Sequence, residues 1–338
     1  PYTFGPRHFI TKEQSVFDYL NSIVPMRSCN EHIFLSYVES DSQFYNFPIH
    51  VDDIERMPDS KAIKKELSSR QNFKPDDKFE DYWIKSVGPT LYKKFIDGYT
   101  KKMWKLNHCN EFDTFNWSAK GVALKSGSKG VFDDRISAYP LALDGYNAFF
   151  DNLPSLCELY LNMPADFVDL SNSSVVCGKK KFSYDYLINT ISPDLIMQER
   201  YGSLPYIGRT LHKIVLPIEE AFPKDVYFLY YTNDEQFTRI VEYKKFTRHK
   251  SPQTLLGLEV PDLNGRHYPM PIKAEMRRAE RYFQDMPKNV FSIGRAGTYR
   301  YAVDIDDCIE QAMVVAEHIG SGSLPEHPVP HLKWRAEN

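Results

Sequence analysis

The sequence predicts a mixed α/β fold, because runs with the period of amphipathic helices alternate with short runs that have the two-residue period of strands. The chain has 338 residues, of which 42% are hydrophobic and 26% are charged. This composition is typical of a globular protein with a sizeable buried core. No run approaches the ~18 consecutive apolar residues of a membrane-spanning helix, so we expect no membrane span.

The N-terminal region is predicted to contain a helix and then a strand. Val16 and Leu20 belong to an apolar-periodic run that follows Thr11, a typical N-cap residue. Residues 42–51 alternate between polar and apolar side chains like a strand, and Pro48 is expected to end it because proline has no N–H group for a strand ladder.

A helical subdomain is predicted next. Residues 59–105 carry charged and aromatic side chains at helical spacing, and Pro75 and the pair Gly88-Pro89 should divide them into separate helices. Residues 106–131 have weak periodicity, which predicts a long mobile loop. Further strands are expected at 174–177, 185–190, 226–231 and 238–243, the last two as an antiparallel hairpin, and helices at 272–286 and 305–319.

Charge and cysteine content exclude several classes of function. The formal net charge of −3 provides no global field for nucleic acid or an anionic membrane, so an anion site must be a local cluster of Arg and Lys. The cysteines are odd in number and have no spacing typical of a disulfide framework or a zinc site, so we expect no metal and a reducing cytoplasm. They are Cys29, Cys109, Cys157, Cys177 and Cys308.

Arg239 is a candidate anion ligand. It lies in the strand-like run 237–246, on a face with apolar neighbours, and a half-buried guanidinium requires a fixed anion. One interpretation is a structural salt bridge to a carboxylate such as Glu259. The other is a phosphate ligand, because Arg presents a planar fork of donors to phosphate oxygens. The residues alone leave both interpretations open.

Two further segments carry candidate binding residues. Residues 91–104 form an aromatic stripe of the kind that is most often core, but Trp104 ends the stripe directly before the loop, where its ring could stack on a ligand. In residues 289–320, Asp304 is expected to cap a helix. Capping does not explain Arg295 or Tyr301, whereas a bound anion or electron-rich cofactor at the strand-to-helix junction would.

The order of these segments resembles that of the UDP-galactopyranose mutase family, flavoenzymes that interconvert the six- and five-membered ring forms of UDP-galactose. The resemblance extends over nearly the whole chain, and its last two segments are the most specific. It is carried by FGPRHFITKEQSVFDYLNSI, FYNFPIHV, LYKKFIDGYTKKMW, FDDRISAYPLALDGYNAFFDNL, YDYLINTISPDL, SLPYIGRTLHKI, QFTRIVEYKKF and GRAGTYRYAVDIDDCI.

The resemblance implies an α/β (mixed α+β) fold in which a Rossmann-like FAD-binding domain, incomplete at its N-terminus, accompanies a helical subdomain and an antiparallel substrate-binding sheet. It also implies FAD as the cofactor, reduced for activity, and a UDP-hexose as the substrate. A homodimer is left open, and the implied role is galactofuranose formation for polysaccharide biosynthesis in the cytoplasm. In such enzymes the reduced flavin acts as the nucleophile, while the protein supplies orientation and charge.

The resemblance assigns roles to particular residues of this chain. The uridine would be held by Tyr99 and Trp104. The catalytic contacts to the diphosphate and the sugar would come from Arg209, Arg239, Tyr268 and Tyr301, with Glu259 as a supporting carboxylate in the substrate site. The cofactor would be contacted by Arg295, Asp304, the backbone at Ile305, Pro6 and Phe9.

The chain departs from the family pattern at three places. No strand-Gly-x-Gly-x-x-Gly-helix segment occurs in it, and the place for one would lie upstream of Pro1. A histidine that the family keeps at the flavin aligns with Ile10. The mobile-loop arginine aligns near Lys120 or Gly121, and a lysine there would be a less directional charge. These departures favour nucleotide-sugar binding over unimpaired turnover.

Two alternatives to a mutase follow. One is a catalytically impaired UDP-sugar-binding homologue or subunit, and the other is a flavin amine-oxidase-like oxidoreductase, which would not need Tyr99, Trp104 and Arg239.

The resemblance also implies how the chain is organised. The expected organisation is 1–55 for the remainder of the FAD-binding domain and a first substrate strand, 56–110 for the helical subdomain, 111–135 for the mobile loop, 136–290 for FAD-domain strands and the substrate sheet, 291–320 for the flavin-contacting strand and helix, and 321–338 for the tail.

Overall fold

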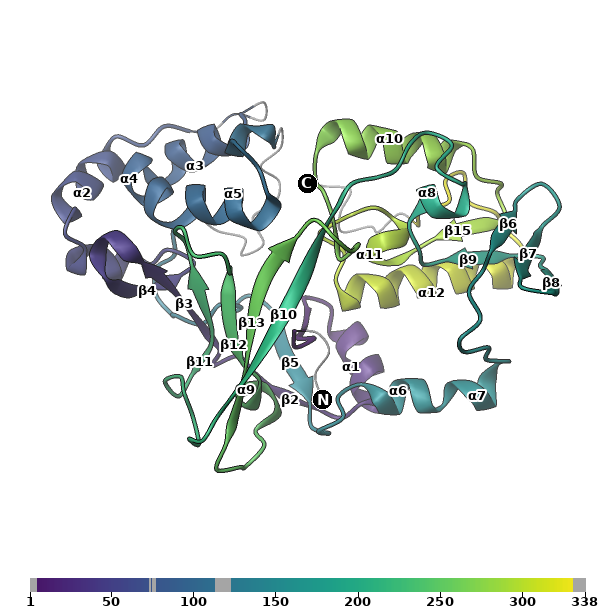
Figure 1. Ribbon diagram of the computed structural model, residues 1–338, viewed down its shortest axis with the longest axis horizontal. Coiled ribbons are helices and arrows are strands. Elements are labelled where there is room, and N and C mark those ends of the chain that lie inside the picture. The colour runs from purple at the N-terminus through teal and green to yellow at the C-terminus, as the bar shows by residue number, and fades with distance from the viewer. Residues whose placement is uncertain (1–4, 73, 75–76, 113–122, 331–338) are drawn as a thin grey trace. The chain divides into compact units, whose positions relative to one another are not determined.

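The computed structural model describes residues 5–72, 74, 77–112 and 123–330, and the chain divides into two compact units. Unit 1 is formed by 1–14, 24–145 and 207–265, and unit 2 by 15–23, 146–206 and 266–338. Each unit is therefore assembled from segments that are distant in the sequence (Figure 1). The fold is mixed α/β, as the sequence predicts.

Unit 1 is built on a large sheet, and the strands that unit 1 contributes to it run in the order β10-β13-β12-β11-β3-β4. All neighbours are antiparallel except β11 and β3, which are parallel. The predicted hairpin of β11 and β12 is confirmed. The strands are β3 (Ile33–Val38), β4 (Gln43–Phe47), β10 (Tyr206–Leu216), β11 (Val226–Tyr231), β12 (Arg239–Glu242) and β13 (Thr254–Asp262).

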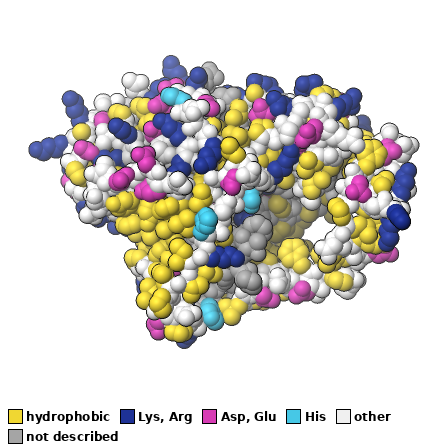
Figure 2. Space-filling model, viewed as in Figure 1, with side chains coloured by type: hydrophobic (Ala, Val, Ile, Leu, Met, Phe, Trp, Pro, Cys, Tyr) yellow, Lys and Arg dark blue, Asp and Glu magenta, His cyan; other side chains and the backbone are white. Residues whose placement is uncertain are grey.

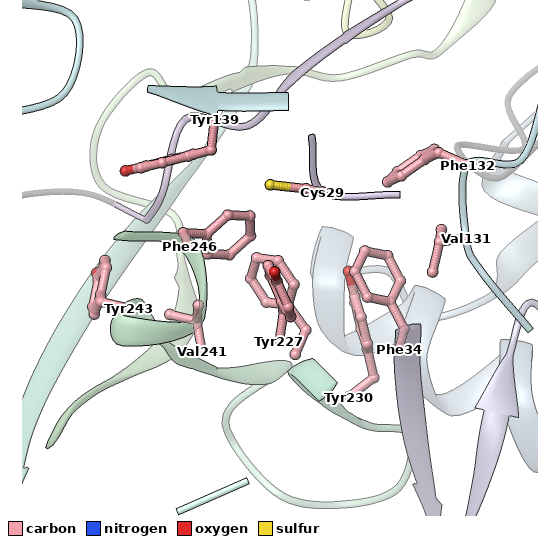
Figure 3. Packing of buried hydrophobic residues seen from close by; sticks show 11 residues of the cluster. Cys29, Phe34, Val131, Phe132, Tyr139, Tyr227, Tyr230, Val241, Tyr243 and Phe246 are labelled. Atoms are coloured by element: carbon pink, nitrogen blue, oxygen red, sulfur yellow. The ribbon is translucent and has the colours of Figure 1, made fainter. Parts of the chain in front are cut away.

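One face of this sheet is covered by an aromatic core cluster. Along β3 the side chains alternate between buried and half-buried, so Phe34 points into the cluster and Leu35 points away from it. Figure 3 shows Phe246 between Tyr139 and Tyr227, and its ring centroid lies 5.1 Å and 4.7 Å from theirs. Burial of such aromatic rings supplies a large part of the stability of unit 1.

The second face of the same sheet carries half-buried aliphatic side chains, which include Leu35, Leu229 and Ile240 on three neighbouring strands. Figure 2 shows a concentration of hydrophobic side chains over this part of unit 1. No helix in the described ranges is long and apolar enough to cross a membrane.

Short helices occupy one end of the unit 1 sheet (Figure 1). The predicted division at Gly88-Pro89 is confirmed, because one helix ends at Val87 and the next begins at Pro89. Pro75 lies outside the described residues. The helices are α2 (Ser60–Ser68), α3 (Phe79–Val87), α4 (Pro89–Tyr92), the π-helical turn η3 (Lys93–Asp97) and α5 (Gly98–Trp104).

The π-helical turn fixes α5 against the β11–β12 hairpin. Such a turn interrupts the regular ladder of helical hydrogen bonds, and the Lys94 carbonyl accepts a bond of 2.8 Å from Thr232 Oγ1. A Cβ atom on Gly98 would lie 2.4 Å from the Thr232 carbonyl oxygen, so only glycine permits this close approach. The side chains of α5 are thereby positioned beside the sheet.

Smaller elements complete unit 1. A three-stranded antiparallel sheet has the order β1-β5-β2, with Ile10 opposite Ser137. The predicted loop 106–131 contains one short helix, and its residues 113–122 lie outside the described ranges. These elements are β1 (Phe9–Thr11), β2 (Met26–Ser28), β5 (Ile136–Pro140), η1 (Glu39–Asp41), η2 (Val51–Arg56), η4 (Cys109–Glu111) and α9 (Tyr243–Thr247).

Unit 2 contains a parallel strand pair, β9 with β15, and the antiparallel sheet β6-β7-β8. Helix α1, apart from its first residue Gln14, also belongs to unit 2. Its elements are α1 (Gln14–Ile23), α6 (Asn147–Asp151), α7 (Leu153–Leu156), β6 (Phe167–Asp169), β7 (Ser174–Cys177), β8 (Lys180–Ser183), β9 (Leu187–Asn189), α8 (Pro193–Ile196), β14 (Tyr268–Pro269), α10 (Lys273–Gln284), β15 (Val290–Ser292), α11 (Gly294–Gly297) and α12 (Ile305–Ser321).

Helix α12 has the N-terminus that the sequence predicts. Asp304 is its N-cap residue, and the Asp304 N–H donates to Asp307 Oδ2 at 2.7 Å in a capping box. At the other end, Gly322 has a φ of 70°, a left-handed conformation that glycine adopts without strain. Local chain chemistry therefore determines both ends of this helix.

Candidate active site

Strand register brings three of the predicted site residues together on the unit 1 sheet. Arg239 on β12 lies directly opposite Glu259 on β13. On the other side of β13, Leu211 lies opposite Glu259, and Arg209 is two residues away on the same face of β10. The Glu259 carboxylate is thus placed between two guanidinium groups, although Arg239 is 20 positions and Arg209 50 positions away from it in the sequence.

The two arginines bind different oxygens of Glu259. Arg239 donates to Oε2 from Nε at 2.9 Å and from Nη2 at 2.7 Å, and Arg209 Nε donates to Oε1 at 3.0 Å. Burial by itself would raise the pKa of Glu259, but the charges of Arg239 and Arg209 outweigh burial and hold that pKa below its usual value. The predicted salt bridge of Arg239 to Glu259 is confirmed.

The two arginines differ in accessibility. The Arg209 side chain is 6% exposed, and its other contacts include the Gly208 carbonyl oxygen at 2.7 Å and Met103 Sδ at 2.9 Å. The Arg239 side chain is 24% exposed, and its guanidinium carbon lies 4.9 Å from the centre of the Phe228 ring. Arg239 is therefore the more accessible arginine of this pair, and its contact with an external anion stays a prediction.

Helix α5 adds two side chains next to these arginines. Met103 contacts Arg209, and the Tyr99 hydroxyl lies 3.7 Å from Met103 Sδ. The Tyr99 ring packs 5.8 Å from that of Tyr230 on β11. The predicted substrate residue Tyr99 is thus connected to the arginine cluster through Met103, a residue that the sequence did not single out.

Trp104 has a different environment from the one expected of a stacking platform. It is 1% exposed, and its ring packs edge to face on Phe112 with centroids 5.5 Å apart. An exposed ring before a loop and a buried ring at a helix end have the same local sequence pattern, so only packing distinguishes them. The role of Trp104 toward uridine stays a prediction.

We expect Trp104→Phe to lower the free energy of unfolding by about 1–2 kcal/mol, because the smaller ring leaves a cavity beside Phe112. Denaturant unfolding of the variant measures this loss. UDP affinity, measured by calorimetry on the folded variant, tests the predicted role toward uridine, and a change of less than about twofold would contradict that role. A loss of roughly 1–3 kcal/mol in UDP binding would instead show that the indole stacks on the base.

Unit 2 brings four other predicted residues into one cluster. The rings of Tyr268 and Tyr301 pack at 5.4 Å with an interplanar angle of 65°. The guanidinium carbon of Arg295 lies 5.2 Å from the first ring and 5.5 Å from the second. Arg295 is held by Asp304 Oδ1 at 2.6 Å and by the Val303 carbonyl oxygen at 2.9 Å. Ile305 begins α12 immediately after Asp304.

The remaining predicted cofactor contacts belong to unit 1. Phe9 is fully buried in β1, and Pro6 is half-buried. A Cβ atom on the neighbouring Gly5 would lie 3.8 Å from Glu259 Oε2, so this segment passes close to the arginine cluster. Flavin contacts by Phe9 and Pro6 stay predictions. Lys120 and Gly121, where the loop arginine was aligned, lie outside the described residues.

Two hollows of unit 1 are lined by other residues. One is lined by Asp59, Lys94 and Asn233 among others, and the second by basic side chains that include Lys244 and Arg248. Neither is lined by any of the predicted site residues. In the described part of the chain, no three His, Cys, Asp or Glu side chains are grouped so as to hold a metal ion.

A family comparison covers most of the residues of these clusters. Residues 94–301, more than half of the chain, match the sequence model of the family GLF, described as UDP-galactopyranose mutase. The chain belongs to the UDP-galactopyranose mutase family. The matched range contains every predicted substrate residue, from Tyr99 to Tyr301.

Two relatives are named as mutases. A probable UDP-galactopyranose mutase of Klebsiella pneumoniae is 23% identical, with 97% of this chain and 84% of the relative covered. A dTDP-fucopyranose mutase of Escherichia coli is 24% identical, with 94% and 84% covered. The crystal structure of a reduced UDP-galactopyranose mutase has the same fold, with a TM-score of 0.75, 15% identity, and 98% of this chain and 88% of that chain covered.

A putative protoporphyrinogen oxidase from Exiguobacterium sp. 255-15 is also similar in fold, with a TM-score of 0.65, 11% identity, and 94% of this chain and 87% of that chain covered. At this identity the likeness concerns the fold alone. The family match assigns this chain to the UDP-galactopyranose mutase family.

The family is flavin-dependent, and the unit 2 cluster has donors of a kind that suits a flavin. Arg295 supplies a cation, and the start of the 17-residue α12 supplies N–H groups and the positive end of a helix dipole. Such donors complement the carbonyl oxygens and excess electron density of a reduced flavin ring. Flavin contacts by Arg295, Asp304 and the backbone at Ile305 stay predictions.

Proposed function

We propose that this mutase-family chain interconverts the pyranose and furanose forms of a UDP-hexose with FAD as its cofactor. The observation that supports this most directly is Arg239, the more exposed of two arginines held by one buried carboxylate on the unit 1 sheet. A guanidinium held in this way has a fixed direction before a ligand arrives, which suits the oxygens of a diphosphate.

The arginines would act on the leaving group. The ring change requires the bond between the anomeric carbon and the diphosphate to break and later to form again, and the diphosphate carries negative charge while it is free. Arg239 would stabilise that charge without reorganising, because Glu259 already fixes its position. Arg209 would keep the Glu259 carboxylate ionised and in place. The same residues serve both directions of the reaction.

The tyrosines of unit 2 would orient the sugar. When bound, reduced FAD supplies the nucleophile for the anomeric carbon. Tyr268 and Tyr301 present hydroxyl groups on a packed pair of rings, which can bind sugar hydroxyls or phosphate oxygens and exclude water. Arg295 would hold the flavin edge beside them.

The experiment that tests this proposal is turnover with a panel of nucleotide sugars. The full-length protein is loaded with FAD, its flavin absorption spectrum is recorded, and the dithionite-reduced protein is offered UDP-galactose, UDP-N-acetylgalactosamine and dTDP-fucose. We expect chromatography to resolve a furanose product from a UDP-hexose. If the protein turns over dTDP-fucose alone, the nucleotide of its substrate is dTDP and not UDP. A protein that binds flavin but no nucleotide sugar would contradict the proposal.

A second candidate function, a UDP-sugar-binding homologue with little turnover, is motivated by Ile10. This side chain lies on β1 opposite Ser137, is half-buried and packs against the aromatic core cluster. It can neither donate nor accept a proton at the place where the family resemblance puts a histidine. UDP binding by a protein that turns over no sugar of the panel would favour this candidate.

We expect Ile10→His to raise kcat by roughly one to two orders of magnitude, because the imidazole restores a proton donor and acceptor. Steady-state kinetics of the flavin-loaded protein measure the change. Ile10→Phe is the matched control, since it has a ring of similar size without nitrogen, and it should not raise kcat. Equal rates for the two variants would show that no histidine function is missing at this position.

A further inference from the structure

We infer that the ion pair of Asp194 and Arg266 acts as a positioning device for the Tyr268–Tyr301 ring pair. The inference deepens the proposed function and rests on it, because the two tyrosines are the residues proposed to orient the sugar. All the contacts that support it lie within unit 2.

Asp194 is the buried centre of the device. It belongs to α8 and is 0% exposed, and both of its carboxylate oxygens lie 2.9 Å from Arg266 Nη1. Oδ2 also accepts a hydrogen bond of 2.9 Å from the Leu204 N–H, and Oδ1 accepts one from the Ser192 hydroxyl. A buried carboxylate with this many donors has a fixed position, so its arginine partner is fixed too.

Arg266 transmits that position to the backbone beside Tyr268. Its Nη2 donates to Ser203 Oγ at 2.9 Å, and its guanidinium carbon lies 5.1 Å from the Tyr206 ring centre. Arg266 precedes Tyr268 by two residues. On the other side, Met270 follows Tyr268 by two residues, and its N–H donates to the Pro205 carbonyl oxygen at 3.2 Å. The short strand that carries Tyr268 is thus tied to residues 203–206 at both ends.

The same Pro205 carbonyl oxygen also holds the chain that carries Tyr301. It accepts a hydrogen bond of 2.7 Å from the Tyr299 hydroxyl, and Tyr299 is 2% exposed. Tyr299 has a φ of 49°, a left-handed conformation that is strained for a residue with a side chain and persists only where its surroundings hold it. Residues 203–206 are therefore a common support for both tyrosines.

A purely structural role for the ion pair makes a different prediction from a positioning role. Arg278 provides the comparison, because it binds the same support through the Ser203 carbonyl oxygen at 3.1 Å and has a similar exposure, 37% against 31% for Arg266. It belongs to α10, however, and does not adjoin either tyrosine in the sequence. Loss of support alone should affect both arginine variants, whereas loss of positioning should affect only the Arg266 variant.

The experiment compares Asp194→Asn, Arg266→Lys and the control Arg278→Lys in the flavin-loaded full-length protein. Asp194→Asn is the main variant because it is expected to destabilise the fold less. When Asp194 loses its charge, water can solvate Arg266, which is partly exposed. Removal of Arg266 would instead leave the buried Asp194 carboxylate unpaired. For each variant we would determine the crystal structure and the midpoint of thermal unfolding. We would also measure the Kd for UDP and the kcat with the nucleotide sugar that is turned over.

We expect Asp194→Asn to shift the Tyr268 ring relative to Tyr301 and to lower kcat by about 10- to 100-fold. UDP affinity should fall much less than kcat, because the substitution leaves Arg239, the main proposed ligand of the diphosphate, unchanged. Arg266→Lys should retain more activity than Asp194→Asn, and Arg278→Lys should keep wild-type kcat.

An unchanged ring pair in the Asp194→Asn crystal structure would overturn the inference, whatever its kcat. An equal fall of kcat in Arg278→Lys would also overturn it in favour of a structural role. Failure of the proposed function is distinguishable from both results, since it would appear as absent turnover in the wild-type protein.

Discussion

Replacing Arg239 with alanine is expected to weaken UDP-sugar binding by about 2–5 kcal/mol, the range for truncating one partner of a buried charged pair at a binding interface. The physical reason is that the arginine is fixed by Glu259 before the ligand arrives, so little side-chain entropy is lost on binding. Calorimetric titration with UDP and with uridine measures the effect. UDP should be affected far more than uridine, because only UDP carries the diphosphate.

Arg27 provides the control for this substitution. It belongs to the same unit, its side chain is 16% exposed, and it donates to the Phe246 carbonyl oxygen and pairs with Glu31. Arg27→Ala should therefore lower stability without changing UDP affinity. If Arg239→Ala loses stability in the same way and keeps wild-type UDP affinity, Arg239 is only the structural partner of Glu259.

Replacing Glu259 with glutamine is expected to cost about 3–5 kcal/mol of stability, because two guanidinium groups would face each other without the carboxylate that neutralises them. Denaturant unfolding measures the loss. Glu242→Gln is the control, since Glu242 is also buried on the neighbouring strand but accepts its hydrogen bonds from the Thr254 hydroxyl and the backbone N–H groups of Ala221 and Phe222. Its charged neighbour, Lys245 Nζ, lies 3.9 Å away, farther than the arginine nitrogens are from Glu259. The loss in Glu242→Gln should be smaller, because hydrogen bonds to neutral donors are weaker than those between charged groups.

The Glu259 prediction has a pH dependence whose sign follows from the lowered pKa. A carboxyl whose pKa is lower in the folded than in the unfolded state stabilises the fold above its unfolded pKa, and that contribution is lost as the pH falls through the folded value. The ordinary pKa of glutamate is 4.5. The stability difference between wild type and Glu259→Gln should therefore be constant at neutral pH and shrink below about pH 4.5. A difference that does not change down to the acid transition would contradict the charge-based account.

Sequence reasoning failed for the longest strands of the unit 1 sheet. Neither β10 nor β13 was predicted, although together they supply Arg209 and Glu259. In β13 the residues Gly257 and Pro261 are typical strand breakers. A Cβ atom on Gly257 would come within 2.8 Å of the Tyr243 ring, so this glycine is required by packing rather than by a turn. That reason is visible only in three dimensions.

The sequence by itself determined the local features of this protein. The β11–β12 hairpin, the helix break at Gly88-Pro89 and the capped start of α12 each depend on residues only a few positions apart, whose conformational preferences act within one turn or loop. The order of its motifs also sufficed to predict the family.

Only the tertiary structure decided how the site residues are used. It placed Glu259 between two arginines, buried Trp104 against Phe112 and supported Tyr268 and Tyr301 on one segment, 203–206. These arrangements depend on strand register and side-chain packing between residues far apart in the chain. A one-residue shift of register would turn Arg239 or Glu259 to the opposite face of the sheet, and no local pattern specifies that choice.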